Sequence, residues 1–195
     1  MERFSDCMYR DICKYDEECD TACKRYKFTS FLLKHSNIPL SKQTSNILVP
    51  DEIDEDAFDI LDDIRNNIDE FVEQGRKLYL FSKHCGNGKT SWAIRMLLQY
   101  FDYIWEDCSL DTRGVIISVP EYIRKSKSFN SPDAVSYINQ LDNAIEKSDI
   151  VVFDDLGFAD MSNWDYSTLS PKSLKSSFLS KLLVTTIALP LNSQS

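Results

Sequence analysis

A short glycine-containing segment carries the residue types that bind nucleotide phosphates. Residues 83–90 have the sequence KHCGNGKT, which nearly matches the pattern G-x-x-x-x-G-K-[ST], with Lys83 in place of the first glycine. Two glycines let the backbone turn so that successive N–H groups face phosphate oxygens. Lys89 is placed to reach the β- and γ-phosphates of ATP, and the Thr90 hydroxyl to help hold Mg²⁺. The predicted nucleotide-binding residues are Gly86, Asn87, Gly88, Lys89, Thr90 and Ser91.

A pair of carboxylates supplies the second half of this chemistry. Asp154 and Asp155 end an apolar run and lie 65 residues after Lys89. One carboxylate at the tip of a strand can hold Mg²⁺ through its water shell, and the next can polarise an attacking water. We assign the metal to Asp154 and water activation to Asp155. With Lys89 they form the predicted catalytic set of a nucleoside triphosphatase.

Four cysteines near the amino terminus have a spacing that suits a metal. Cys7, Cys13, Cys19 and Cys23 follow the pattern C-x5-C-x5-C-x3-C. Four thiolates this close can surround a tetrahedral Zn²⁺, which would stabilise a region of about 30 residues that has too little core to fold alone. Free thiols or partial ligation are the alternative. Cys85, within the phosphate loop, is interpreted as a small space-filling residue.

The hydrophobic pattern predicts the elements that position these residues. Strands are expected at 78–81, 114–120 and 149–155, and helices at 58–72, 92–100 and 132–147. Strands that are continuous apolar runs and alternate with helices are typical of a parallel sheet covered on both faces. The expected fold class is therefore α/β, preceded by the small Cys-rich region.

Composition and charge limit the classes of partner. The 195 residues carry a net charge of -9, and residues 51–75 alone hold eleven acidic side chains and one basic one. Such a protein is not expected to bind DNA tightly by itself, because neutralising the DNA phosphates requires clustered Lys and Arg side chains. The acidic run is interpreted as a solvated helix face, with a docking surface for a basic partner as the alternative. No run is apolar and long enough to span a membrane, so we expect a soluble, cytoplasmic protein.

Three segments together resemble a known family. Residues 78–93, 117–122 and 151–157 look like those of DnaC/DnaI-type replicative helicase loaders, and more narrowly like the phage and prophage versions. The segment Asn37-Ile38-Pro39 and the cysteine cluster also fit that group, and the resemblance covers roughly residues 5–166.

The resemblance implies a P-loop ATPase of the AAA+ type that binds a hexameric replicative DNA helicase and helps to place it on single-stranded DNA. The small amino-terminal region of such proteins usually contacts the helicase. In such proteins the ATPase module self-associates and touches DNA, and the resemblance implies ATP and Mg²⁺ as cofactors.

Residues 167–195 fit this resemblance less well. They hold eight Ser, three Thr and no acidic residue, and no arginine follows Arg124, so the family's arginine finger is missing. Residues 182–187 could form the strand that follows the acidic pair, with Asn192 as a sensor candidate. We interpret the tail as truncated or read in a shifted frame. The predicted organisation is 1–30 Cys-rich, 31–50 linker, 51–166 partial ATPase domain and 167–195 atypical tail.

Other functions share the same phosphate-binding residues. A P-loop kinase would use several arginines over its acceptor, and only Arg95, Arg113 and Arg124 follow the loop. A nucleotide-gated adaptor would bind ATP and helicase without turnover. A transposition-helper ATPase has the same core, and its motifs do not distinguish it from a helicase loader.

Overall fold

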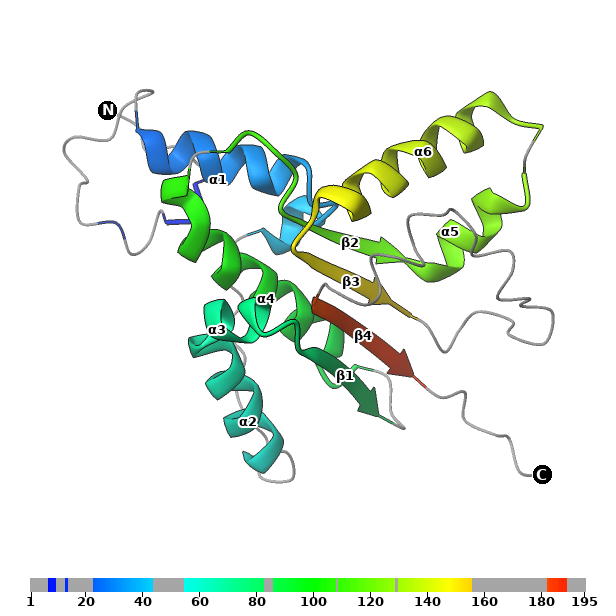
Figure 1. Ribbon diagram of the computed structural model, residues 1–195. Helices are drawn as coiled ribbons and strands as arrows, with labels where there is room; N and C mark the ends of the chain where they lie inside the picture. The colour runs from blue at the N-terminus through cyan, green and yellow to red at the C-terminus, as the bar shows by residue number, and fades with distance from the viewer. Residues whose placement is uncertain are drawn as a thin grey trace, which may run out of the picture.

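A sheet of four parallel strands in the order β1-β4-β3-β2 forms the centre of this mixed α/β protein (Figure 1). The computed structural model describes residues 7–9, 13, 23–43, 55–82, 86–107, 109–128, 130–155 and 182–188. The strands are β1 (Lys77–Ser82), β2 (Gly114–Ser118), β3 (Ile150–Asp154) and β4 (Leu182–Ala188). The helices are α1 (Lys24–Lys34), η2 (Leu40–Lys42), α2 (Glu55–Asn66), α3 (Ile68–Glu73), α4 (Lys89–Ile104), η3 (Trp105–Asp107), α5 (Val119–Ser126) and α6 (Pro132–Lys147).

Helices cover both faces of the sheet, because alternate strand residues point in opposite directions. On one face, Ile116, Ile150 and Val152 join a core with α1, α3 and α4. On the other face, Val115 and Val151 pack against α5 and α6. The predicted parallel sheet with helices on both faces is confirmed. None of the helices in the described ranges is long and apolar enough to cross a membrane.

Most predicted elements are present, with two differences. The apolar stripe over 58–72 is divided between α2 and α3 at Asn67, whose side chain donates to the backbone and carboxylate oxygens of Asp63. Asparagine commonly offers the backbone such alternative hydrogen bonds, which favours a break in a helix. In addition, β2 ends at Ser118 and α5 begins at once, with Pro120 in its first turn. Proline suits a first helical turn, where its missing N–H has no partner to lose.

Strand β4 occupies the middle of the sheet although it is the last strand in the described part of the chain. Its backbone pairs in parallel with β1, from Lys77–Leu183 to Ser82–Ala188, and with β3, from Ile150–Leu182 to Phe153–Thr185. The strand predicted at 182–187 is thus confirmed. Neighbouring strands lie about 4.8 Å apart, so β4 separates β1 from β3 by roughly 10 Å.

The outer edge of β2 is closed by the turn that follows α1. The backbone N–H of Ile116 donates to the carbonyl of Ser36 over 2.8 Å, and the Asn37 amide donates to the Ile116 carbonyl over 3.5 Å. Asn37 has φ +59°, a left-handed conformation that asparagine tolerates better than most residues. This contact places the Asn37-Ile38-Pro39 segment at a sheet edge, where unpaired backbone groups otherwise invite association.

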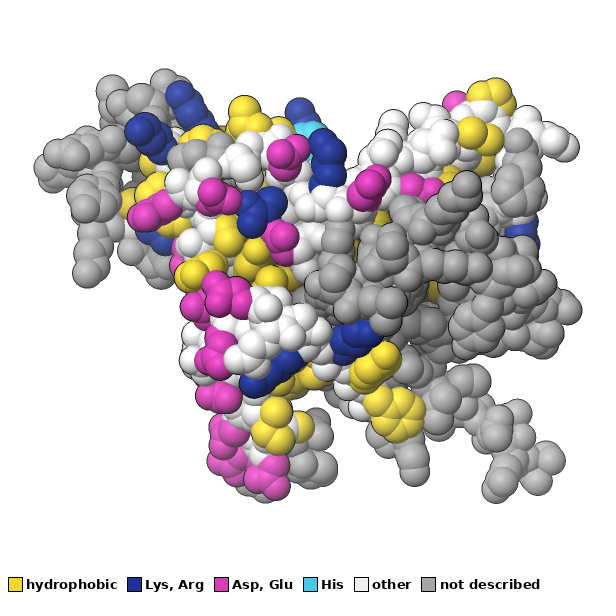
Figure 2. All heavy atoms as spheres, in the orientation of Figure 1, with side chains coloured by type: hydrophobic (Ala, Val, Ile, Leu, Met, Phe, Trp, Pro, Cys, Tyr) yellow, Lys and Arg dark blue, Asp and Glu magenta, His cyan; other side chains and the backbone are white. Residues whose placement is uncertain are grey.

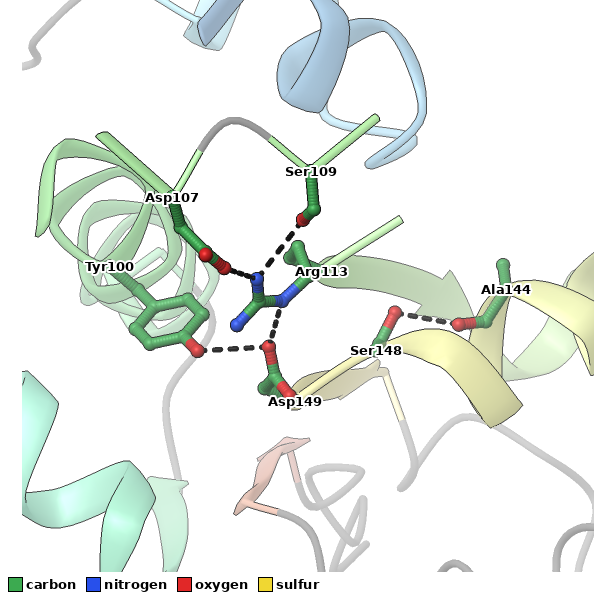
Figure 3. Close-up of polar contacts among 7 residues, drawn as sticks. All are labelled: Tyr100, Asp107, Ser109, Arg113, Ala144, Ser148 and Asp149. Atoms are coloured by element: carbon green, nitrogen blue, oxygen red, sulfur yellow. Dashed lines mark hydrogen bonds and ion pairs between the residues drawn. The ribbon is translucent and has the colours of Figure 1, made fainter. Parts of the chain in front are cut away.

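Arg113 fixes the amino-terminal ends of β2 and β3 to α4 (Figure 3). Its guanidinium donates to Asp149, just before β3, and to Asp107 in η3. The Tyr100 hydroxyl donates to Asp149 over 2.9 Å. Burial and the Asp149 charge raise the pKa of Tyr100 above its ordinary value, so the hydroxyl keeps its proton and stays a donor. The network anchors the end of the sheet opposite to Asp154.

Gly114 allows α4 to lie directly on the start of β2, because a Cβ there would overlap the side chains of Leu97 and Phe101. Both side chains are fully buried and have no room to move. We therefore expect Gly114→Ala to lower the free energy of unfolding by about 1–3 kcal/mol, as other overpacked cores do. Urea unfolding of the wild type, Gly114→Ala and an Asn139→Ala control on the exposed side of α6 measures it. A Gly114→Ala protein as stable as the control would contradict this packing.

Candidate functional site

The predicted phosphate loop and the predicted acidic pair lie at the same end of the sheet. All four strands are parallel, so β1, which leads into the loop, and β3, which ends at Asp154, present their carboxyl ends to one edge. Gly86 and Gly88 have φ of +89° and +78°, which only glycine adopts at little cost. Gly88 is the N-cap of α4, so the loop turns directly into that helix.

Thr90 and Asp154 meet across the width of β4. The Thr90 hydroxyl donates a hydrogen bond of 2.9 Å to Oδ1 of Asp154, although the two residues are 64 positions apart. Both side chains are half-buried. A hydroxyl and a carboxylate in contact are two hard oxygen ligands of the kind that Mg²⁺ takes, alongside water and phosphate oxygens. The structure therefore brings together the two residues that the sequence assigns to magnesium.

The amine of Lys89 lies close to the remaining site residues. It donates to Oδ1 of Asn87 over 2.9 Å, and its charge is near enough to act on Asp155. Burial and repulsion from Asp154 raise the pKa of Asp155, while Lys89 lowers it. Asp155 has φ +60°, a left-handed conformation that turns the chain sharply away from β3. Lys89, Asp154 and Asp155, the predicted catalytic set, thus share one neighbourhood.

The start of α4 suits an anion. The backbone N–H groups of a helix's first turn have no intrahelical partners, and the helix dipole makes that end positive. No acidic residue occupies the first turn of α4, where Lys89, Thr90 and the half-buried Ser91 lie. A Cβ built on Gly86 or Gly88 would meet no atom within 4 Å, so there is space beside the loop backbone. These features fit a triphosphate with its Mg²⁺.

The three arginines that follow the loop have different surroundings. Arg113 is tied to Asp149, five residues before Asp154, which is roughly 16 Å away along β3 at the rise of a strand. Arg124 lies in the last turn of α5 and pairs with Glu121 of the same helix at 3.7 Å. Burial and the neighbouring Arg65 charge lower the pKa of Arg95, which places it beside α2. Arg113 is thus engaged away from the loop, whereas Arg95 lies over the Trp92 ring, with its guanidinium carbon 6.0 Å from the ring centroid, on the helix that begins at the loop.

The zinc prediction depends partly on residues outside the described ranges. Cys7, Cys13 and Cys23 are described and form no disulfide, whereas Cys19 lies outside. Among the described residues, no group of three or more His, Cys, Asp or Glu side chains is arranged to hold a metal ion. The Cys23 sulfur instead accepts the backbone N–H of Tyr26 at the start of α1. The zinc site stays a prediction. Lys83, Cys85 and Asn192 also lie outside the described residues.

The sequence analysis missed the contact between α2 and the phosphate-loop helix. Phe58 of α2 meets Trp92 in the first turns of α4, with ring centroids 5.1 Å apart in an edge-to-face arrangement. Each residue begins a helix predicted from the sequence, but nothing in their spacing indicates that they pair. The contact holds the beginning of α4 against α2.

No protein-family model matches this chain, and no curated protein is similar to it at a significant level.

The raised pKa of Asp155 predicts a stability difference that depends on pH. A raised carboxyl pKa means that the folded protein binds the proton more tightly than the unfolded chain, so ionised Asp155 destabilises the fold above its folded-state pKa. Asparagine also tolerates a positive φ, so Asp155→Asn removes the charge without straining the backbone. We expect this variant to raise Tm at pH 7 by only about 1–2 °C, because solvent screens the exposed Asp155 side chain.

The difference in Tm should disappear at about pH 4, near the pKa of an unfolded aspartate. Thermal scans of the wild type, Asp155→Asn and an exposed Glu106→Gln control at both pH values check it. An Asp155→Asn protein that is less stable than wild type at pH 7 would show that the carboxylate stabilises the fold instead.

Proposed function

We propose that this chain is a magnesium-dependent ATP-binding protein of the P-loop class, AAA+ type, that acts as a helicase loader in DNA replication. The observation that carries the nucleotide site is the Thr90–Asp154 hydrogen bond. This bond connects Thr90, which follows the glycine loop, to Asp154 at the end of β3. Strand β4 lies between β1 and β3 in the sheet.

Each site residue has a separate task in this proposal. The N–H groups that follow Gly86 and Gly88 bind phosphate oxygens, and Lys89 leaves Asn87 to neutralise the β- and γ-phosphates. Thr90 and Asp154 hold the magnesium ion, which withdraws charge from the phosphates when bound. Asp155 orients a water for attack, and its raised pKa makes it a stronger base than an ordinary aspartate.

The helicase-loader part of the proposal depends on the resemblance of residues 78–93, 117–122 and 151–157 to DnaC/DnaI-type proteins. The segment Asn37-Ile38-Pro39, which lies at the edge of β2, is also part of that resemblance. In such a protein the amino-terminal region would contact the helicase, and the α/β domain would bind ATP and DNA.

The nucleotide site is tested by replacing the lysine. We expect Lys89→Ala to weaken the binding of a non-hydrolysable ATP analogue by roughly 10- to 100-fold, the effect of losing one or two charge-assisted hydrogen bonds. Titration calorimetry with magnesium measures it, and circular dichroism verifies that the fold is kept. Lys127→Ala, on an exposed lysine beyond α5, is the matched control. Unchanged affinity in Lys89→Ala would refute the assignment of the loop.

Helicase loading is tested by capture. We expect the wild type to co-purify with the hexameric replicative helicase of the cell in which its gene is found, and to do so differently with and without ATP. Lys89→Ala should bind the helicase but lose this dependence on ATP. Failure to capture the helicase in either state would reject the loader role and leave the nucleotide site standing.

The same samples separate the other functions. Phosphate release stimulated by helicase and single-stranded DNA identifies an ATPase. Tight ATP binding without release identifies a nucleotide-gated adaptor. Transfer of the γ-phosphoryl to a small acceptor identifies a kinase, and capture of a transposition protein in place of the helicase identifies a transposition helper.

A further inference from the structure

Helix α2 has an outer face that this chain leaves exposed. None of its residues is buried, and its apolar residues Phe58, Leu61 and Ile64 are only half-buried against the core. Ile60 is 62% exposed. Residues 55–73 of α2 and α3 contain eight Asp and Glu and a single Arg. The α2 surface, defined as Asp56, Asp59, Ile60 and Asp63, is therefore an apolar side chain among exposed carboxylates.

Helix α1 carries the opposite pattern. Residues 23–43 contain five Lys and Arg and no Asp or Glu. Lys24, Lys27 and Lys34 are exposed, and their spacing puts them on one side of the helix with the half-buried Phe31 between them. We call Lys24, Lys27, Phe31 and Lys34 the α1 surface. Arg25 points elsewhere, since it pairs with Asp102 and stacks on the Tyr9 ring at 3.7 Å.

The two surfaces lie at opposite ends of α4, so they do not meet within one molecule. Arg25 of α1 contacts Asp102 and Trp105 at the carboxyl end of α4, whereas Phe58 of α2 contacts Trp92 near its amino end. Ten helical residues separate Trp92 from Asp102, which is about 15 Å. Figure 2 shows acidic side chains along α2 at the lower left and basic side chains over α1 at the upper left.

We propose that the α1 surface of one copy docks on the α2 surface of a second copy, so that the chain associates head to tail. The lysines face the aspartates, and Phe31 lies beside Ile60, which covers the apolar side chain that one molecule leaves in water. A dimer made in this way keeps one unused α1 surface on one copy and one unused α2 surface on the other, so the contact is heterologous and can continue beyond a dimer. The inference does not depend on nucleotide binding.

The size of the two surfaces predicts a weak, salt-sensitive association. Helices of 11 and 12 residues are only about 16–18 Å long, so their contact is smaller than a standard stable interface. Its attraction comes largely from exposed charges, which salt screens over about 10 Å at 0.1 M and over shorter distances at higher concentrations. Association should therefore be measurable at low salt and lost at high salt.

Sedimentation velocity of the full chain with two charge-reversed variants tests the pairing. The α1 variant is Lys24→Glu with Lys27→Glu, and the α2 variant is Asp59→Lys with Asp63→Lys. Each variant alone places like charges at the contact and should associate roughly tenfold or more weakly than the wild type. Mixing the two variants restores opposite charges at every contact, so the mixture should associate as the wild type does. Arg124→Glu with Lys127→Glu equals the α1 variant in number, sign and spacing but lies at the carboxyl end of α5, so it is the matched control and should behave as the wild type.

Each measurement either supports or overturns the proposal, and circular dichroism verifies that every variant is folded. The proposal is overturned if the wild type stays monomeric at about 50 mM salt. It is equally overturned if a variant alone associates as the wild type does, or if the mixture of folded variants remains monomeric. Weakening by the α5 control to the same extent would show a general effect of charge and reject the α1–α2 contact.

Discussion

The hydrogen bond from Thr90 to Asp154 depends on nearly every other feature of the fold. Thr90 follows β1, and Asp154 is the last residue of β3. These two strands are not neighbours, because β4 lies between β1 and β3 and separates the strands by roughly 10 Å. The loop after β1 must therefore cross the end of β4 before α4 begins. Two glycines with positive φ make that path feasible in a few residues, and a residue with a Cβ would be strained at either position. The contact is thus a consequence of strand order as much as of the loop itself.

Helix α4 connects the Thr90–Asp154 contact to the rest of the molecule. Its first turn supplies Lys89 and Thr90, and its buried side lies on β2, close enough that only glycine fits at position 114. Further along the helix, Tyr100 bonds to Asp149, and Asp102 pairs with Arg25 of α1. Because Arg113 also holds Asp149, the amino-terminal ends of β2 and β3 are fixed to the same helix whose other end forms part of the proposed phosphate site. A shift of α4 along its axis would disturb both ends of the sheet together.

The parts of the candidate site that depend on local backbone chemistry could be predicted from the sequence. The parts that depend on which strands and side chains pair with one another could not. Glycine spacing predicts the loop, and the apolar run before Asp154 predicts a buried strand, because backbone conformation and burial restrict residue type at each position. Strand order is different, since any of several parallel orders would bury the same apolar runs. The central position of β4 could not be derived for that reason. The break at Asn67 and the role of Asn37 at the β2 edge were missed because each depends on one side chain bonding to the backbone.

The position of α1 limits how the amino-terminal region can influence the proposed nucleotide site. Arg25 connects α1 to Asp102, and Thr90 lies twelve residues earlier on the same helix, about 18 Å away. A continuous helix of this length behaves as one body. A displacement of α1 therefore moves α4 as a whole, including its end at the glycine loop, as long as the Arg25–Asp102 contact is kept. Movement of α4 would change the Thr90–Asp154 distance directly, because Asp154 belongs to a different element. Any partner that binds the amino-terminal region and shifts α1 would then act together on the proposed magnesium ligand Thr90 and on Gly88, which caps the same helix.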